Sequence, residues 1–235
     1  MCGRYASSAS RDVLVDTFEL DEVVDLPGPS WNVAPTDLVP AVVERPAENG
    51  PRRKLVPLKW GLVPSWSKDA SGGARMINAR VETVAEKPAF RRAFAARRCL
   101  LPADGYYEWY TTEQRDAKGK PVKQPFFIRP ADGGLLVMAG LYEFWKSPGG
   151  EWLSTCTVIT TTATDELGRI HDRMPMVIGR RGWDDWLNPD FDGDPHELLH
   201  VPAPELEAYA VSRAVGQVAN NSPDLVVPLP EAAAE

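Results

Sequence analysis

The chain has 235 residues, of which 43% are hydrophobic and 25% are charged, and its formal net charge at pH 7 is −7. These values are ordinary for a globular protein, and the length suits one large domain with a full core. No apolar run approaches the roughly 20 residues of a membrane span, and the start lacks the basic and apolar regions of a signal peptide. We therefore expect a cytoplasmic protein, acting at the nucleoid if it binds DNA, with no membrane segment and no coiled-coil pattern that would require more than a monomer.

The charges are unevenly distributed along the chain. Residues 51–129 hold 17 of the 26 lysines and arginines but only 7 of the 33 acidic residues. A basic middle segment in an acidic chain can form one positive face that holds phosphates. The alternative is a scatter of solvated surface arginines.

Metal and redox chemistry have little support in the sequence. Cys2, Cys99 and Cys156 make an odd count without CxxC spacing, which is not typical of a disulfide framework or a cysteine-rich zinc site. The segment from His196 to His200 matches the H-E-x-x-H zinc pattern, but Pro202 leaves room for only about two helical turns. We expect a surface helix there, no metal and no organic cofactor.

In the first half, apolar residues at helical spacing predict a short helix over 8–20, followed by an irregular, proline-rich stretch over 22–36. The runs 38–44 and 54–62 predict a hairpin around a polar turn. A second helix is expected over about 88–97.

The second half is mainly β in pattern. Strands are expected at 98–101, 106–110, 124–129, 135–145, 152–162 and near 208–212, with a long loop at 112–123 and short helices at 182–187 and 195–200. Without a regular βαβ alternation, this predicts an α+β fold, with a curled, barrel-like, mainly antiparallel sheet and flanking short helices. We expect a single domain over 1–222 and a tail over 223–235.

The first residues carry the most distinctive chemistry. Cys2 follows the initiator methionine and precedes Gly3, so removal of methionine would leave a thiol and an α-amine on one residue. An α-amine has a pKa of roughly 7.7–8.0 and is partly unprotonated near neutral pH. Such a terminus can attack an amide as an N-terminal nucleophile or trap an aldehyde. It can also be an incidental cysteine at a frayed end.

Three further residues are candidates for chemistry. Asn78 lies on an extended segment, Glu108 lies between aromatic residues on an expected strand, and His171 precedes an arginine and a proline. If Glu108 faces inward, desolvation raises its pKa and makes it a usable proton donor or acceptor. Taken singly, the three can also be a turn residue, an ion-paired strand residue and a core histidine.

Seven motifs in order carry a family resemblance. The chain resembles the SRAP family, the abasic-site processing proteins, from residue 2 to about 222. The matching residues are Met1-Cys2-Gly3-Arg4, Asn32-Val33-Ala34-Pro35, Trp60-Gly61 with Pro64 and Trp66, Ile77-Asn78-Ala79-Arg80 with Glu82-Thr83, Gly105-Tyr106-Tyr107-Glu108-Trp109, Gln124-Pro125-Phe126 and Ile170-His171-Asp172-Arg173-Met174-Pro175.

The resemblance implies an enzyme that binds single-stranded DNA containing an abasic site. By similarity, the amine of Cys2 forms a Schiff base with the ring-opened sugar aldehyde, and the thiol closes it to a thiazolidine crosslink that shields the strand from cleavage. Asn78 would orient Cys2 and the sugar. Glu108 would be the acid/base for imine formation, and His171 the acid/base for sugar ring opening and reversal.

The resemblance also implies a DNA-binding set. Arg4, Arg80 and Arg173 would hold phosphates, and Asn32 would line the site. Trp60 and Trp66 would stack on or wedge between bases. Two alternatives remain: an N-terminal-cysteine autopeptidase or amidohydrolase, which could also remove Met1, and a non-catalytic single-stranded DNA binding module.

Overall fold

Strands dominate the computed structural model, which describes residues 2–48, 50–163, 167–200 and 202–230. The strands are β1 (Tyr5–Ser7), β2 (Glu22–Val23), β3 (Ser30–Val33), β4 (Leu38–Arg45), β5 (Arg52–Trp60), β6 (Asn78–Arg80), β7 (Arg98–Ala103), β8 (Gly105–Arg115), β9 (Pro121–Pro130), β10 (Leu136–Lys146), β11 (Trp152–Thr162), β12 (Arg173–Pro175) and β13 (Leu206–Ala210). The α-helices are α1 (Arg11–Phe18), α2 (Arg91–Ala96), α3 (Leu167–Ile170) and α4 (Trp183–Leu187). Short 3₁₀ helices are η1 (Ser71–Arg75), η2 (Val81–Thr83), η3 (Arg180–Gly182), η4 (Glu197–His200), η5 (Arg213–Gly216) and η6 (Pro223–Val226). Among the described residues, no helix combines the length and apolarity needed to cross a membrane.

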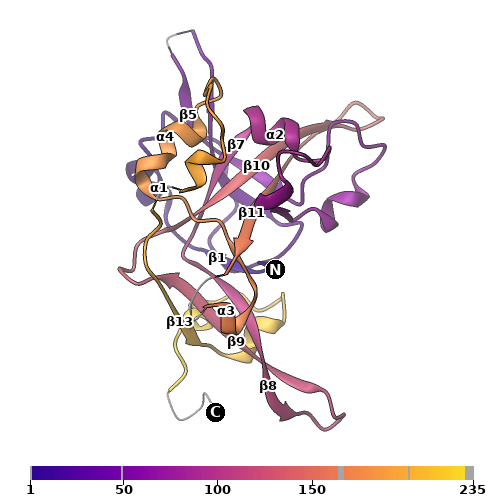
Figure 1. The fold of residues 1–235 in the computed structure, drawn as a ribbon, viewed down its shortest axis with the longest axis vertical. Helices are drawn as coiled ribbons and strands as arrows, with labels where there is room; N and C mark the ends of the chain where they lie inside the picture. The colour runs from indigo at the N-terminus through magenta and orange to yellow at the C-terminus, as the bar shows by residue number, and fades with distance from the viewer. Residues whose placement is uncertain (1, 49, 164–166, 201, 231–235) are drawn as a thin grey trace.

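A closed barrel forms the upper body of the molecule in Figure 1. Its strands follow the order β11, β10, β7, β4, β5 and return to β11. Neighbouring strands are antiparallel except β5 and β11, which close the barrel in parallel through Lys59–Thr155 and Trp60–Cys156. The expectation of a single α+β domain with a barrel-like, mainly antiparallel sheet is confirmed.

Both faces of the barrel strands are buried. On β4, Val39, Ala41 and Val43 belong to one apolar cluster, while Val42 between them belongs to the cluster that holds the helices. Because successive side chains of a strand point to opposite faces, the first cluster fills the barrel and the second lies outside it. The stacked rings of Phe18 in α1 and Trp183 in α4, 4.7 Å apart, belong to the outer layer.

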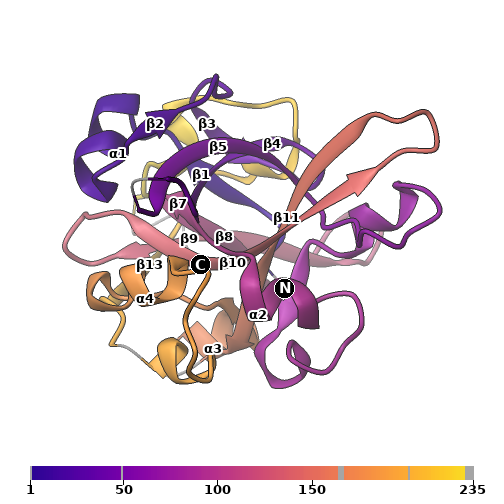
Figure 2. The ribbon, with the colours of Figure 1, turned by 90° about the horizontal axis from the view of Figure 1, so that it is seen from above.

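A second sheet lies below the barrel in Figure 1, in the order β13, β9, β8, β1, β3. It begins where β7 passes almost directly into β8. Its strand β1 pairs Tyr5 with Tyr106 of β8 and with Val33 of β3. The Tyr5 ring also meets the Trp60 ring of the barrel edge-on, with centroids 5.1 Å apart. The start of the chain is therefore held between barrel and sheet, and Figure 2 shows the N-terminal end near the middle of the molecule.

The structure differs from the sequence-based expectation in the segment 112–123. This is not a long loop, because β8 continues to Arg115 and β9 starts at Pro121. The ladder continues through the pairs Thr111–Lys123 and Arg115–Pro121. The extension is mostly solvent-exposed, so it has no hydrophobic alternation from which a strand could be predicted.

The structure also differs from the expectation of a tail over residues 223–235. Residues 223–226 form η6, and Leu225 is buried in a cluster with Tyr107 and Val215. Val211 pairs with Pro228 in an isolated bridge, and the Leu229 N–H donates to the Ala210 carbonyl at 2.9 Å. The chain therefore packs against the second sheet beyond residue 222, while residues 231–235 lie outside the described part.

Candidate functional site

Cys2 lies inside the molecule, just before β1. Its side chain is fully buried in the barrel cluster that also holds Tyr5 and Trp60. Asn78 Nδ2 donates to the Cys2 carbonyl oxygen at 2.8 Å. Asn78 is placed by β6, which pairs in parallel with β11 through Asn78–Val158. The structure thus brings two of the predicted catalytic residues together although 76 residues separate them.

The other end of the Asn78 amide is available to a ligand. Its Oδ1 atom is buried and has no hydrogen-bond partner among the described residues. A buried acceptor without a partner costs free energy, so such atoms are often found where a ligand supplies the missing donor. A hydroxyl or an N–H of a bound molecule would satisfy Asn78 Oδ1 beside Cys2.

Glu108 extends the cluster from the second sheet. It pairs with Phe126 of β9 and is only 4% exposed. Burial raises the pKa of Glu108, and the nearby His171 opposes that shift. Burial also raises the pKa of the Cys2 thiol, and the Glu108 carboxylate adds to the increase. The thiol is therefore protonated near neutral pH, and Glu108 is a carboxyl group suited to proton transfer.

His171 lies between α3 and β12, where its ring faces two different partners. The Arg173 backbone N–H donates to His171 Nδ1 at 3.0 Å, while Asp172 Oδ1 lies 2.9 Å from the same nitrogen. The first contact needs an unprotonated Nδ1, and the second needs an Nδ1–H group. The Nδ1 atom of His171 therefore has a possible donor and a possible acceptor beside it.

The partly buried Arg4, two residues after Cys2 in the chain, forms a hydrogen-bonded pair with the buried Asn32. One guanidinium nitrogen of Arg4 donates to Asn32 Oδ1 at 2.8 Å and to the Val215 carbonyl at 2.9 Å. The Asn32 amide nitrogen contacts the carbonyl oxygens of Asn220, Gln217 and Val215 at 2.7, 3.0 and 3.3 Å. Asn32 is 3% exposed and fully engaged. The Asn32 side chain holds Arg4 and the segment around η5, and its predicted place in the lining of the DNA site stays a prediction.

Arg173 is also engaged by protein groups. Its guanidinium donates to both oxygens of the Glu82 carboxylate, at 2.5 and 3.1 Å, and to the Thr160 carbonyl at 2.6 Å. The hydrogen bond from Arg173 lowers the pKa of Glu82. The predicted phosphate contact would have to compete with Glu82, a partner that the motifs did not reveal. Arg80, at the end of β6, is exposed, and its phosphate role stays a prediction.

The two candidate tryptophans differ sharply. Trp60 is fully buried, and its Nε1 donates to the Ile77 carbonyl at 2.9 Å. A buried indole has no face to offer a base, so the prediction that Trp60 stacks on DNA is wrong. Trp66 is 61% exposed, and its loop is fixed to β10 by a 2.7 Å hydrogen bond from Trp145 Nε1 to the Ser67 carbonyl. Trp66 keeps its predicted DNA-binding role as a prediction.

Part of the basic segment serves the fold. Arg98 is 2% exposed and donates to backbone carbonyls at the ends of α2 and α4. Arg53 pairs with Glu44 and Asp184, and Arg97 pairs with Glu143. The exposed cations of this segment are Arg52, Lys68, Arg75, Arg80, Lys87, Arg91 and Arg92, with Arg115, Lys118, Lys120 and Lys123 on the extension of β8 and β9.

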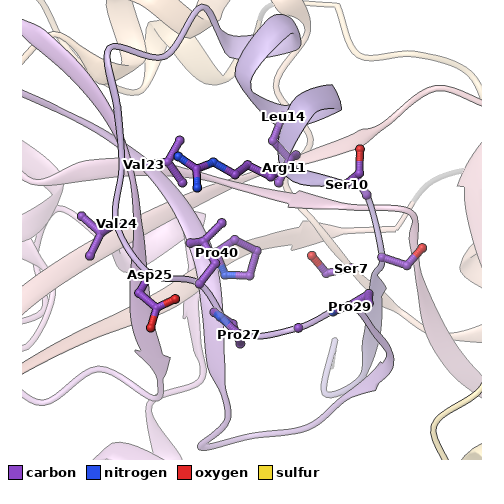
Figure 3. Close-up of a pocket in the computed structure, with 14 residues that line it drawn as sticks. Ser7, Ser10, Arg11, Leu14, Val23, Val24, Asp25, Pro27, Pro29 and Pro40 are labelled. Atoms are coloured by element: carbon purple, nitrogen blue, oxygen red, sulfur yellow. The ribbon is translucent and has the colours of Figure 1, made fainter.

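A separate cavity of about 450 Å³ opens between the start of α1 and the loop after β2. In Figure 3, the Arg11 side chain extends toward Val23, and Pro40 lies in the middle of the group of lining residues. None of the four candidate catalytic residues lines it. We do not assign this cavity to the site.

Fold and site together define a class, a single-domain α+β protein with a buried cysteine near the amino terminus beside an amide, a carboxylate and an imidazole. A family model described as SOS response associated peptidase (SRAP) matches residues 1–218. The chain therefore belongs to the SRAP family, and the resemblance based on its motifs is confirmed.

Named relatives match over nearly the whole chain. The "Abasic site processing protein YoqW" of Bacillus subtilis is 40% identical over 233 residues, which are 96% of this chain and 99% of the relative. The "Abasic site processing protein HMCES" of Mus musculus is 30% identical over 277 residues, covering 97% and 76% of the two chains.

Solved structures share the fold. One from Bacteroides thetaiotaomicron has a TM-score of 0.79 at 24% identity and covers 97% of this chain and 100% of its own. Another, from Bordetella bronchiseptica, has a TM-score of 0.70 at 27% identity and covers 90% and 100%.

Proposed function

We propose that this protein processes abasic sites in single-stranded DNA by forming a covalent thiazolidine link between Cys2 and the sugar aldehyde. The observation that carries the proposal is the cluster at Cys2. The Asn78 amide donates a hydrogen bond to the Cys2 carbonyl oxygen. Burial and the Glu108 carboxylate raise the pKa of the Cys2 thiol, and His171 opposes the rise that burial causes in the pKa of Glu108. The curated names of the relatives, which describe abasic site processing, support the same substrate.

In the first step, the Cys2 amine, freed by removal of Met1, attacks C1′ of the ring-opened sugar. His171 accepts and returns the proton that ring opening requires. The addition product loses water when Glu108 donates a proton to the departing hydroxyl, which leaves an imine. Asn78 Oδ1 accepts a hydrogen bond from the amine or a sugar hydroxyl.

In the second step, Cys2 Sγ adds to the imine carbon and the thiol proton passes to the imine nitrogen. A carbon–sulfur bond forms, the carbon–nitrogen double bond becomes single, and a five-membered thiazolidine results. Because the thiol is protonated near neutral pH, the amine is the group that reacts first. Ring closure removes the imine that would otherwise promote strand cleavage.

Burial of Cys2 supports selectivity for a damaged nucleotide. In the chain that still carries Met1, the Cys2 side chain is 0% exposed and belongs to the cluster inside the barrel, so a reacting sugar has to approach the interior of the protein. An intact nucleotide carries a base at C1′, which both blocks the reacting carbon and needs more room. A sugar without a base can place C1′ beside the aminothiol.

The same thiol chemistry argues against the peptidase alternative. A cysteine that attacks an amide needs a thiolate, which positive neighbours or a helix N-terminus favour by lowering the pKa. The Cys2 thiol pKa is shifted the other way, by burial and by Glu108. If the protein removes Met1 itself, a neighbouring base would have to take the proton from the Cys2 thiol during the attack, because the thiol is not already ionised.

A denaturing gel tests the proposal. A labelled single strand with one abasic site is mixed with wild-type protein and with Cys2→Ala, after mass spectrometry has confirmed that Met1 is absent. A heat-stable shifted band is expected for wild type only, and for abasic DNA only. The Cys2→Ser variant should give a band only after borohydride reduction, since serine does not form the stable thiazolidine. Equal, salt-sensitive binding of intact and abasic strands without a stable band would favour the non-catalytic binding module.

The reaction should slow below about pH 6, because an α-amine with a pKa of roughly 7.7–8.0 is then almost wholly protonated. A capture rate that stays flat down to about pH 5 would rule out this amine as the nucleophile.

A further inference from the structure

A large groove adjoins the site on the second sheet. It has a volume of about 910 Å³, and its apolar lining comes from β8, β9, α3, β12 and β13. The aromatic walls are Tyr110 and Phe126, whose rings meet edge-on at 85° with centroids 6.4 Å apart. Ile170, which also lines the groove, directly precedes His171.

The groove continues the surface that carries Glu108. Residues two apart on a strand share a face, and directly opposed residues of an antiparallel pair do so too. Tyr110 follows Glu108 by two positions, and Phe126 lies opposite Glu108 on β9. Tyr106, on the same face, belongs to the buried cluster of Cys2. One sheet face thus runs from the Cys2 cluster, past Glu108, into the groove.

We propose that this groove is a subsite for the base of a nucleotide adjoining the abasic one, with Tyr110 as the stacking residue. This inference rests on the proposed function. When the abasic sugar lies at Cys2, its neighbour on the strand lies close to the same sheet face. A base is apolar on its faces and fits between aromatic and aliphatic walls, whereas a charged phosphate would lose its hydration there.

The polar groups at the rim fit a nucleotide. Arg169 and Glu205 are both exposed at the edge of the groove, and Glu207 is paired with Arg129 at 2.8 Å. Arg169 can meet the phosphate that links the two sugars. Glu205 can accept a hydrogen bond from the exocyclic amine of cytosine or adenine, a contact that thymine does not offer. The groove can therefore hold a base while the phosphate stays outside.

Tyr110 is well placed for a clean test. Its side chain is 42% exposed, so truncation removes a groove wall without opening the core. Tyr110→Phe keeps the ring and serves as the conservative rescue. Trp152→Ala removes another exposed aromatic residue, which is 67% exposed on β11 and does not line the groove, and serves as the matched control.

The first experiment measures crosslinking rates at limiting protein concentration on three abasic strands. One has normal neighbours, and the others carry a base-free propanediol spacer on the 5′ or the 3′ side of the lesion. On the normal strand, Tyr110→Ala should be roughly five- to tenfold slower than wild type, as expected for one lost stack. On one of the two spacer strands, wild type and Tyr110→Ala should react at the same rate, which is lower than the wild-type rate on the normal strand. Tyr110→Phe and Trp152→Ala should react at the wild-type rate on all three strands.

Equal rates of wild type and Tyr110→Ala on all three strands would overturn the subsite. So would a uniform slowing by Tyr110→Ala that ignores the spacers, because that pattern reports a general effect on the fold. If wild type forms no crosslink on the normal strand, the proposed function fails instead.

A second readout does not depend on the chemistry. Cys2→Ala protein binds a strand with a tetrahydrofuran abasic analogue next to 2-aminopurine. Stacking on Tyr110 should quench the fluorescence, and Tyr110→Ala in the same background should restore it at saturating protein. Identical fluorescence of the two complexes, with 2-aminopurine on either side, would refute the proposal even if covalent capture is established.

Discussion

Replacement of Asn32 by alanine should have a large effect on both stability and capture. The Asn32 side chain joins Arg4 to the backbone of the segment around η5, more than 180 residues away in sequence. Truncation leaves the carbonyl oxygens of Gln217 and Asn220 without their buried donor. It also removes the acceptor that holds the Arg4 guanidinium beside the site.

The size of the effect follows from the hydrogen bonds. An amide nitrogen has two hydrogens, so we count two neutral bonds at about 1 kcal/mol each and one bond from the charged Arg4 at about 1.5–3 kcal/mol. The expected loss in the free energy of unfolding is about 3.5–5 kcal/mol, a large part of the 5–15 kcal/mol typical of a domain. Urea unfolding at 25 °C measures it.

Asn221→Ala is the matched control. Its Oδ1 accepts one exposed hydrogen bond from the Trp31 N–H at 2.7 Å, and it does not contact Arg4. Its removal should cost no more than about 1 kcal/mol and leave crosslinking unchanged. Asn32→Ala, assayed where it is still folded, should crosslink more slowly because Arg4 keeps only the Val215 carbonyl of its two acceptors. A loss below about 1 kcal/mol for Asn32→Ala would show that water replaces these bonds and that our accounting is wrong.

Three further variants test the site and its loops. Glu108→Gln should slow imine formation by about 100-fold or more in single-turnover assays, and a rate near wild type would remove Glu108 from catalysis. Because burial raises the folded-state pKa of Glu108, the folded protein binds this proton more tightly than the unfolded chain, so the Glu108 contribution to stability falls as pH rises above the usual glutamate range. Glu108→Gln should therefore be the more stable protein near neutral pH, with no such advantage in acid, as urea midpoints at several pH values will show. Gly61→Ala should destabilise by more than about 2 kcal/mol, since its φ is +130° and a Cβ would lie 2.7 Å from the Gly73 carbonyl oxygen, whereas Gly28→Ala, with nothing within 4 Å, should be nearly neutral in thermal unfolding. Trp66→Ala should weaken binding to single-stranded DNA by about fivefold or more at an unchanged melting temperature, and unchanged binding would assign the loop another role.

Long periodic strands were the part of the fold that could be predicted. The β4–β5 hairpin and the strands β10 and β11 carry long apolar runs between polar turns, and their positions agree with expectation. The short strands β1 and β3 could not be predicted, because each has four residues or fewer and pairs with a strand distant in sequence. Their stability comes from tertiary neighbours, which local patterns do not contain.

The order of the seven family motifs along the chain was more informative about the candidate site than the chemical properties of single residues. Asn78 and Cys2 meet only because β6 pairs with β11, a contact that spacing cannot reveal. Trp60 was misassigned although a signal existed, since it is two residues from Leu58 on the same apolar strand face. The engagement of Arg173 by Glu82 depends on the fold and had no counterpart in the sequence pattern.

The bond from Arg4 to the Val215 carbonyl spans 211 residues, and this has a consequence for biosynthesis. At about 5–20 residues per second, a ribosome makes Val215 roughly 10–40 s after Arg4. During that interval the nascent chain displays an aminothiol terminus without the groups that position its neighbours. If the proposed function holds, the complete site for an abasic sugar therefore forms only when synthesis is nearly over, and a stalled or truncated chain should be a poor and unselective trap for aldehydes.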